Sequence, residues 1–210
     1  MEVGKTYYVR AYAINAEGTA YGNQVSFSPS NTVVINGVKW ATCNVDKPGT
    51  FAAKPESSGM FYQWNRKVGW SSTDPPENSN GETTWDNSTP SGSTWEKYND
   101  PSPAGYRVPT KDEIDKLLDT NKVKSEWTNY NGVNGRKFTD KTSGNSIFLP
   151  AAGYRVGSYG TLYYVGTFGY YWSSTQNDTS GAYNLYFNGS RADWYYGNGA
   201  SGFSVRPVAK

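Results

Sequence analysis

The pattern of a stable α-helix occurs in only one short segment of this 210-residue chain, and this scarcity constrains the fold most. Thr110 and Glu113 have the spacing of a capping box, in which a hydroxyl and a carboxylate each accept a backbone N–H at the start of a helix. Ile114, Leu117 and Leu118 follow at the spacing of one buried stripe. We therefore predict one clear helix in this segment.

Elsewhere, short apolar runs are separated by turn-forming residues. Tyr, Trp, Thr, Asn and Gly are abundant, and these types favour short strands joined by tight turns. Asn36 and Gly37 stand between two apolar runs, which is a strong hairpin signal. We allow one further short helix near residues 59–64. Strands are expected at residues 146–149, 160–165, 182–187 and 202–208.

A long loop is predicted from residue 70 to residue 102, where Ser, Thr, Pro, Asn and Trp recur without a period. Its Trp70, Trp85 and Trp95 are expected to hold it against the body of the domain. The predicted fold class is therefore α+β, with a small antiparallel sheet, one or two helices and long ordered loops.

Residues 1–28 form a separate segment. Apolar and polar residues alternate on both sides of Gly18, which predicts a hairpin. The stretch resembles the last two strands of a fibronectin type III domain, so we interpret it as a fragment of one, followed by a linker at residues 29–31 and a main domain at residues 32–210. A lone hairpin is marginal in water, and we expect it to pack on the following domain or on a neighbour. Whether it has a role of its own is left open.

Composition excludes several classes of site. The chain has 20 Lys and Arg residues and 18 Asp and Glu residues, which argues against nucleic-acid binding through phosphate contacts. It has no His and one Cys, Cys43, so the usual structural zinc sites and an intramolecular disulfide are excluded. No run approaches the ~18 apolar residues of a membrane span. The first residues lack the apolar core of a secretion signal, and we expect the natural targeting segment to be absent from this chain. No cofactor and no metal are predicted.

Several motifs of the main domain occur together in one known family. They are VKWATCNV at residues 38–45, PGTF at 48–51, DPSPAGYRVPT at 100–110, LPAAGYR at 149–155, YWSST at 171–175 and GFSVRPV at 202–208. Over residues 33–208, the set resembles the Fibrobacter succinogenes major paralogous domain. The resemblance implies a C-type lectin-like fold related to the formylglycine-generating enzyme scaffold, in surface proteins of Bacteroidetes or their phages.

The resemblance also bears on the single cysteine. The family often has a Cys where this chain has Ser102, so Cys43 lacks the family's usual partner. We interpret Cys43 as a small buried hydrophobe. The related oxidase scaffold needs two active-site cysteines, and one Cys excludes that chemistry.

The end of the chain resembles the variable region of proteins diversified by retroelements. In those proteins, adenine-directed mutagenesis scatters Asn codons into Tyr, Asp, Ser, Gly, Thr and Ala. Most residues from Gln176 to Ser201 are of these types, the exceptions being Gln176, Leu185, Phe187, Arg191 and Trp194. The resemblance implies a variable region at residues 170–201.

A recognition surface is predicted within this region. Alternation places Tyr183, Leu185 and Phe187 on one face, taken as core-facing, so that their neighbours face outward. Residues 193–198 are expected to form an aromatic loop of paratope-like composition, whose three adjacent aromatics cannot all point inward. The alternative is that these aromatics fill a thin core, the role assigned to Trp172, Phe203, Val205 and Pro207. The predicted ligand-binding residues are Tyr170, Asn177, Asp178, Ser180, Asn184, Tyr186, Asn188, Asp193, Trp194, Tyr195, Tyr196 and Asn198.

Other chemistry has little support in the sequence. Residues 197–202 match a dinucleotide-binding fingerprint by letter, but they lack its strand–turn–helix context. Asp178 and Asp193 are weak candidates for a cation site. Four carboxylates could in principle supply a pair for glycoside cleavage, but a solvated loop is the favoured interpretation of Glu82, Asp86, Glu96 and Asp100.

We therefore predict a non-enzymatic binding protein that displays a diversified surface to a protein or glycan on another cell or on a phage host. The expected location is extracellular, on a bacterial cell surface or a phage virion. The alternatives are a fixed structural or adhesin module of a Bacteroidetes surface protein and, as a minor one, an enzyme that acts on surface glycans. The oligomeric state is left open.

Overall fold

A computed structural model describes residues 7–27 and 31–210 of the chain. The chain divides into two compact units, residues 1–31 and residues 32–210. The predicted linker at residues 29–31 lies largely outside the described residues. Within the described ranges, no helix is both long and apolar enough to cross a membrane.

The first unit is an antiparallel ribbon of four short strands. Strand β1 (Tyr7–Val9) pairs with β4 (Val25–Phe27), and β2 (Tyr12–Asn15) pairs with β3 (Gly18–Tyr21). The Asn15 side-chain oxygen accepts the backbone N–H groups of Glu17 and Gly18 at 2.9 and 3.1 Å and closes the turn. The predicted hairpin is confirmed, and its expected packing against a neighbour stays a prediction.

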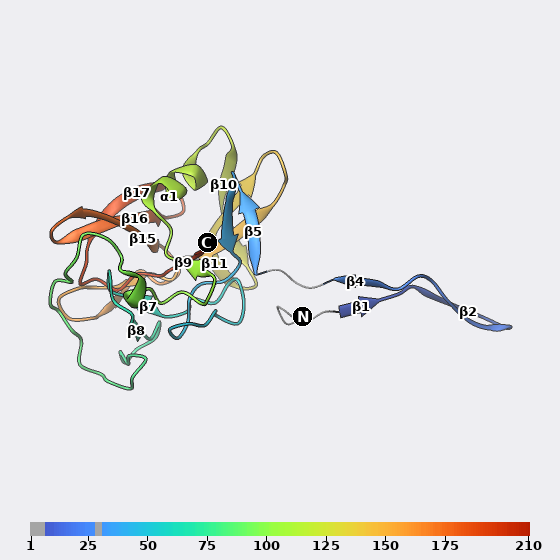
Figure 1. The fold of residues 1–210 in the computed structure, drawn as a ribbon, viewed down its shortest axis with the longest axis horizontal. Coiled ribbons are helices and arrows are strands. Elements are labelled where there is room, and N and C mark those ends of the chain that lie inside the picture. Colours follow the sequence, from blue (N-terminus) through green and yellow to red (C-terminus); the bar gives the residue numbers. More distant parts are fainter. Residues whose placement is uncertain (1–6, 28–30) are drawn as a thin grey trace. The chain divides into compact units, whose positions relative to one another are not determined.

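Strands dominate the second unit (Figure 1). Among its described residues, the helical elements are α1 (Lys111–Leu118) and the short 3-10 helix η1 (Lys97–Asn99). The predicted α+β class and its C-type lectin-like architecture are therefore wrong, because the chain folds mainly as strands in several small sheets. Turn residues interrupt the chain too often for further helices to form. The additional helix allowed near residues 59–64 is also wrong, since this segment contributes strand β7 (Phe61–Tyr62).

Three larger sheets organise the second unit, and all of their pairings are antiparallel. The first has the order β5 (Thr32–Ile35), β6 (Val38–Ala41), β18 (Val208–Ala209) and β9 (Tyr106–Arg107). The second has the order β10 (Val123–Tyr130), β11 (Val133–Asp140) and β12 (Ser146–Pro150). The third has the order β15 (Gly169–Asp178), β16 (Gly181–Phe187) and β17 (Ala192–Asn198). Two small ladders join β7 to β8 (Gly69–Trp70) and β13 (Tyr154–Arg155) to β14 (Leu162–Tyr163).

The strand predictions succeed where pairing is local. The Asn36–Gly37 hairpin forms between β5 and β6, and β12 and β16 match the expected ranges. Strand β14 covers only two residues of the range 160–165. The expected strand at 202–208 forms only at its end, because residues 202–204 instead make single bridges to three separate segments. The expected loop at 193–198 belongs to an edge strand, β17.

Helix α1 begins where the capping box predicts. Thr110 Oγ1 accepts the N–H of Glu113 at 3.3 Å, and the Glu113 carboxylate accepts the N–H of Thr110 at 2.8 Å. Arg107 donates two further hydrogen bonds to the Glu113 carboxylate, at 2.6 and 2.8 Å. Ile114 and Leu117 are buried, which confirms the apolar stripe. The helix contacts strands β15, β16 and β17 (Figure 1).

The sheet of β15, β16 and β17 lies between two buried clusters. Alternation sends Tyr171, Leu185 and Phe187 into one cluster, together with the stripe of α1. It sends Trp172 and Ala182 into the other cluster. Both faces of the sheet are therefore covered over part of their length. The predicted core residues are buried, which confirms the assignment of Trp172, Phe203, Val205 and Pro207, and also of Cys43.

The long loop is held to the body of the unit as predicted. Trp70 and Trp95 are buried, and Trp85 donates a hydrogen bond from its indole N–H to the carbonyl of Gly157 at 2.9 Å. Arg155 is fully buried behind the loop. Its guanidinium donates to the Asp74 carboxylate and to carbonyl oxygens of Ser71, Thr73 and Gly160.

A second buried arginine, Arg206, has only 1% of its surface exposed and forms no ion pair with a described residue. Its Nε donates to the side-chain oxygen of Asn44 at 2.8 Å. Its remaining N–H groups donate at 2.7 to 3.4 Å to main-chain carbonyls of Ala41, Thr42, Pro55 and Phe148. Burying a charge is costly unless hydrogen bonds compensate it, so these carbonyls must converge on one point.

Asp140 joins two turns of the second unit. Its carboxylate accepts the backbone N–H groups of Asn36, Thr142 and Ser143, at 2.7 to 2.9 Å. These bonds stabilise the charged form and lower the pKa of Asp140 to about 2. The carboxylate thereby fixes the β5–β6 turn against the end of β11.

The stability of the second unit should depend on this carboxylate. Its pKa in the folded protein is below the usual value of about 3.9, so its contribution is complete above that value and is lost as the pH falls towards about 2. Asp140→Asn should lower the free energy of unfolding at neutral pH, and the difference from the unchanged protein should shrink in acid. Urea unfolding followed by tryptophan fluorescence measures this effect on the second unit, because all eight Trp residues lie there.

The exposed residue Asp112 provides the control for this experiment. Asp112→Asn should leave the pH dependence of unfolding nearly unchanged. A deficit in Asp140→Asn that stays constant from neutral pH down to pH 2 would show that the stabilisation does not come from the ionised carboxylate.

Candidate ligand-binding surface

The structure divides the predicted site residues between the two faces and the two ends of the β15–β17 sheet. Tyr170 lies opposite Tyr186, which in turn lies opposite Asp193, so these side chains share one face. Trp194 is opposite Leu185, on the face that helix α1 covers. The predicted surface is therefore not one continuous patch.

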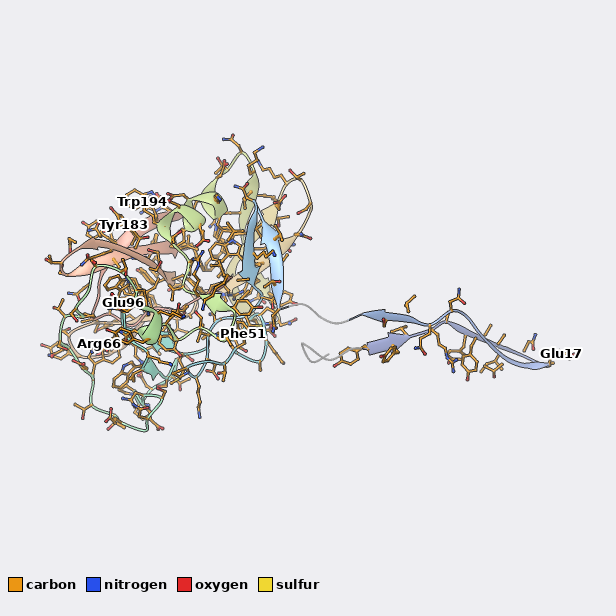
Figure 2. All side chains as sticks on the ribbon, in the orientation of Figure 1. Glu17, Phe51, Arg66, Glu96, Tyr183 and Trp194 are labelled. Carbon is orange, nitrogen blue, oxygen red and sulfur yellow. The ribbon has the colours of Figure 1, made fainter. Side chains whose placement is uncertain are left out.

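On the helix side, Trp194 packs edge-on against Tyr183, with ring centroids 5.4 Å apart (Figure 2). The ammonium group of Lys111, the first residue of α1, lies 4.8 Å from the Trp194 ring centroid. Tyr183 shares the face of Leu185 and Phe187 as predicted, and it is half-buried against the helix. Trp194 is still 42% exposed, because β17 is the edge strand of the sheet.

On the opposite face, three tyrosines and one arginine surround a cavity of about 260 Å³. The Tyr170 and Tyr186 ring centroids are 5.3 Å apart, and those of Tyr186 and Tyr195 are 6.3 Å apart. The fourth lining residue, Arg191, has its guanidinium 5.6 Å from the Tyr186 ring centroid. Sequence reasoning selected the three tyrosines but not the arginine.

Residues of an earlier segment extend this face. Tyr154 packs on Tyr170, with ring centroids 4.9 Å apart, and Phe168 stacks on Tyr186 at 5.7 Å. Tyr163 and Tyr164 follow, each in ring contact with Tyr154. We call the connected rings the tyrosine surface, which comprises Tyr154, Tyr163, Tyr164, Phe168, Tyr170, Tyr186 and Tyr195.

Sequence reasoning missed the residues that come from this earlier segment. The signal was present: Leu162, Tyr163, Tyr164 and Val165 are four consecutive large residues that cannot all point inward. Tyr163, Tyr164 and Val165 are indeed exposed. Tyr164 has a φ of 61°, in the left-handed region that bulky residues rarely adopt.

Two phenol groups of this surface, those of Tyr154 and Tyr170, have raised pKa values. Partial burial, together with nearby Tyr186 and Tyr154, raises the pKa of Tyr170 well above its usual value. Burial also raises the pKa of Tyr154. Tyr154 and Tyr170 therefore offer neutral rings with hydroxyl groups, a combination suited to recognition of amphipathic ligands.

The remaining polar site residues lie at two turns. Asp178 accepts the backbone N–H and the hydroxyl of Ser180 at the β15–β16 turn. Asn177 donates to Asp178 there, and Asn198 pairs with Gly181 at the same end of the sheet. Asn188 lies at the other end, beside the tyrosine surface. The structure thus brings Asn188, but not Asn177, Asp178, Ser180 and Asn198, to the tyrosine surface.

Asn184 does not face outward as predicted. It is fully buried opposite Trp172, and neither its amide nitrogen nor its side-chain oxygen has a hydrogen-bond partner. Alternation identified its face correctly, but that face carries a second buried cluster rather than solvent. Asn184 is therefore a core residue.

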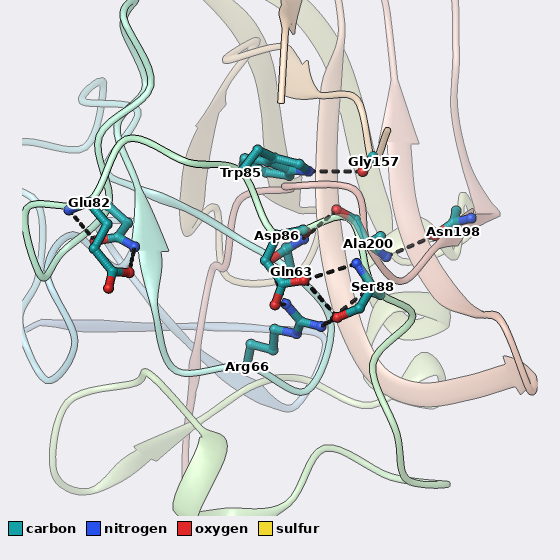
Figure 3. Close-up of polar contacts among 10 residues, drawn as sticks. Gln63, Arg66, Glu82, Trp85, Asp86, Ser88, Gly157, Asn198 and Ala200 are labelled. Atoms are coloured by element: carbon teal, nitrogen blue, oxygen red, sulfur yellow. Dashed lines mark hydrogen bonds and ion pairs between the residues drawn. The ribbon is translucent and has the colours of Figure 1, made fainter. Parts of the chain in front are cut away.

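Two of the four candidate catalytic carboxylates form hydrogen bonds or an ion pair with nearby residues (Figure 3). Asp86 pairs with Arg66 and accepts hydrogen bonds from Ser88, whereas Glu82 lies apart and accepts from Asn78 at 2.7 Å. The other two acids, Glu96 and Asp100, occur elsewhere in the same loop. Within residues 7–27 and 31–210, no three His, Cys, Asp or Glu residues come together as a metal-binding group.

Comparison with known proteins adds one finding. Residues 122–208 match a family described as a domain of unknown function (DUF8237). The matched range contains the whole tyrosine surface and the β15–β17 sheet. No curated protein and no solved structure matches the chain.

Replacing the unpartnered amide of Asn184 should not destabilise the fold. A buried polar group without a partner costs about 1 to 3 kcal/mol, so Asn184→Leu should leave the free energy of unfolding unchanged or raise it. Asn44→Leu is the matched control, because the equally buried Asn44 amide bonds to Ser58, Tyr171 and Arg206. Urea unfolding should show a large loss for Asn44→Leu only. Equal losses would show that Asn184 has a partner of its own.

Proposed function

We propose that this protein is a non-enzymatic recognition module that binds a partner on another cell or on a phage host through the tyrosine surface. One observation supports the proposal most: rings from two separate segments, 154–168 and 170–195, form one connected and partly exposed surface. A surface of this kind is expected at an extracellular location, where such partners are found.

The residue types of this surface favour binding. Tyrosine buries a large area at low cost in side-chain entropy, and its hydroxyl adapts to different partners. Long charged side chains are depleted at the centres of interfaces, and residues 142–209 contain no Lys and no Glu. The half-exposed rings are therefore arranged as an interface centre would be.

Removing exposed rings of the surface should weaken binding without loss of fold. The probe is intact cells from a panel of bacterial species, with bound fluorescent protein measured by flow cytometry. Tyr195→Ala and Tyr164→Ala should each lower affinity about fivefold or more, the equivalent of about 1 kcal/mol. Tyr159→Ala is the control, because Tyr159 is 80% exposed and lies outside the tyrosine surface. The proposal would be contradicted if a variant carrying both Tyr164→Ala and Tyr195→Ala bound cells unchanged, or if the protein showed no saturable binding to any cell.

We also propose that the region 170–201 is diversified by a retroelement. The exposed positions of β17 tolerate exchange because their side chains lie outside the two buried clusters. Deep sequencing of the 3′ end of the gene from the source population should then show adenine-directed changes at Asp193 and Tyr195 but intact codons at Leu185 and Phe187. An invariant end, without a near-repeat or a reverse transcriptase gene, would instead support the fixed structural or adhesin module.

A further inference from the structure

The cavity in the tyrosine surface is small and has aromatic walls. Its volume of about 260 Å³ lies just below the ~300 to 1,000 Å³ of pockets for drug-sized ligands. Tyr170, Tyr186 and Tyr195 present rings that are tilted by about 50° from one to the next. A space of this volume suits one small ring better than a peptide segment.

The polar groups at this cavity are fixed before any ligand binds. Asn188 donates from its amide to the Tyr186 hydroxyl at 2.8 Å, which leaves the phenolic hydrogen of Tyr186 free to donate elsewhere. The Asn188 side-chain oxygen accepts the backbone N–H of Arg191 at 3.0 Å. Arg136, itself buried, donates to the Asn188 carbonyl at 2.8 Å and anchors this turn to the second sheet. Asn188 therefore positions the Tyr186 hydroxyl and the backbone of Arg191.

Opposite charges flank the same tyrosine. Arg191 lies over the Tyr186 ring and forms no ion pair with a described residue. Asp193 is exposed and directly opposite Tyr186 on the neighbouring strand, so its side chain is on the same face. A hydroxyl group can accept from a guanidinium and donate to a carboxylate at once. Asp193 would repel an anionic ligand, and a purely apolar ligand would make no hydrogen bond with either charged side chain.

We propose that this cavity binds one sugar ring of an uncharged glycan. This inference rests on the proposed recognition function and names the ligand class. A pyranose has an apolar C–H face that packs on tyrosine rings and a rim of hydroxyls that meets Arg191 and Asp193. The phenols and Arg191 line the cavity, and Asp193 lies on the same face beside it, which matches that pattern. The cavity alone is smaller than the interface that a protein partner needs.

The test measures binding of the full chain to immobilised oligosaccharides, both uncharged and acidic, and then the affinity for the best ligand by calorimetry. Uncharged oligosaccharides should bind, and Tyr195→Ala, Arg191→Gln and Asp193→Asn should each weaken binding about fivefold or more. Asn188→Ala should weaken binding with little change in stability. Two controls should have no effect: Tyr159→Ala removes an exposed ring, and Lys124→Gln removes an exposed charge on another sheet.

The outcomes separate this inference from the proposed function. Cell binding that requires Tyr195 but survives enzymatic removal of surface glycans, and is lost on protease treatment, would overturn the glycan assignment and leave the recognition function intact. Selective binding of acidic glycans, strengthened in Asp193→Asn, would also overturn it. Glycan binding that all of the cavity variants retain would place the sugar site elsewhere.

Discussion

A buried guanidinium without a carboxylate partner is the constraint on which the second unit depends. Arg206 is satisfied by main-chain carbonyls around residues 41, 55 and 148, together with the side chain of Asn44. Each of those oxygens must reach the same guanidinium group. The end of the β5–β6 hairpin, the loop around residue 55 and strand β12 therefore have to meet at the final segment of the chain. That segment then passes between Tyr62 and Tyr171 by single bridges, which sets the position of the third sheet. The tyrosine surface is thus placed by a charge in the core.

Local signals predicted local elements, and they failed where distant segments meet. The capping box at Thr110 and the Asn36–Gly37 turn depend on neighbours within a few residues, so the sequence was sufficient for both. The sheet topology was not predictable, because β18 pairs with strands more than 100 residues earlier, a relation that no short pattern records. The single bridges of residues 202–204 are equally non-local.

The candidate site was predictable in the same partial way. Consecutive aromatics at 194–196 signalled exposure, and these residues are exposed on an edge strand. Asn184 was misplaced because alternation tells which residues share a face but not what covers that face. Arg191 and Tyr154 were missed because their roles arise from contacts across a turn and between sheets. Residue types in the sequence indicated the chemistry of the surface, but only the fold showed which residues come together to form it.

The backbone of Tyr164 has a consequence for how this surface is maintained. A bulky residue in the left-handed region costs on the order of 1 kcal/mol, and glycine removes this cost. Glycines occupy that region nearby, at positions 153, 160 and 166. Glycine at position 164 would relieve the backbone but would also remove the ring contacts of Tyr164 with Tyr154 and Phe168. The chain thus bears a local backbone cost at a position where it keeps a half-exposed aromatic ring on the tyrosine surface.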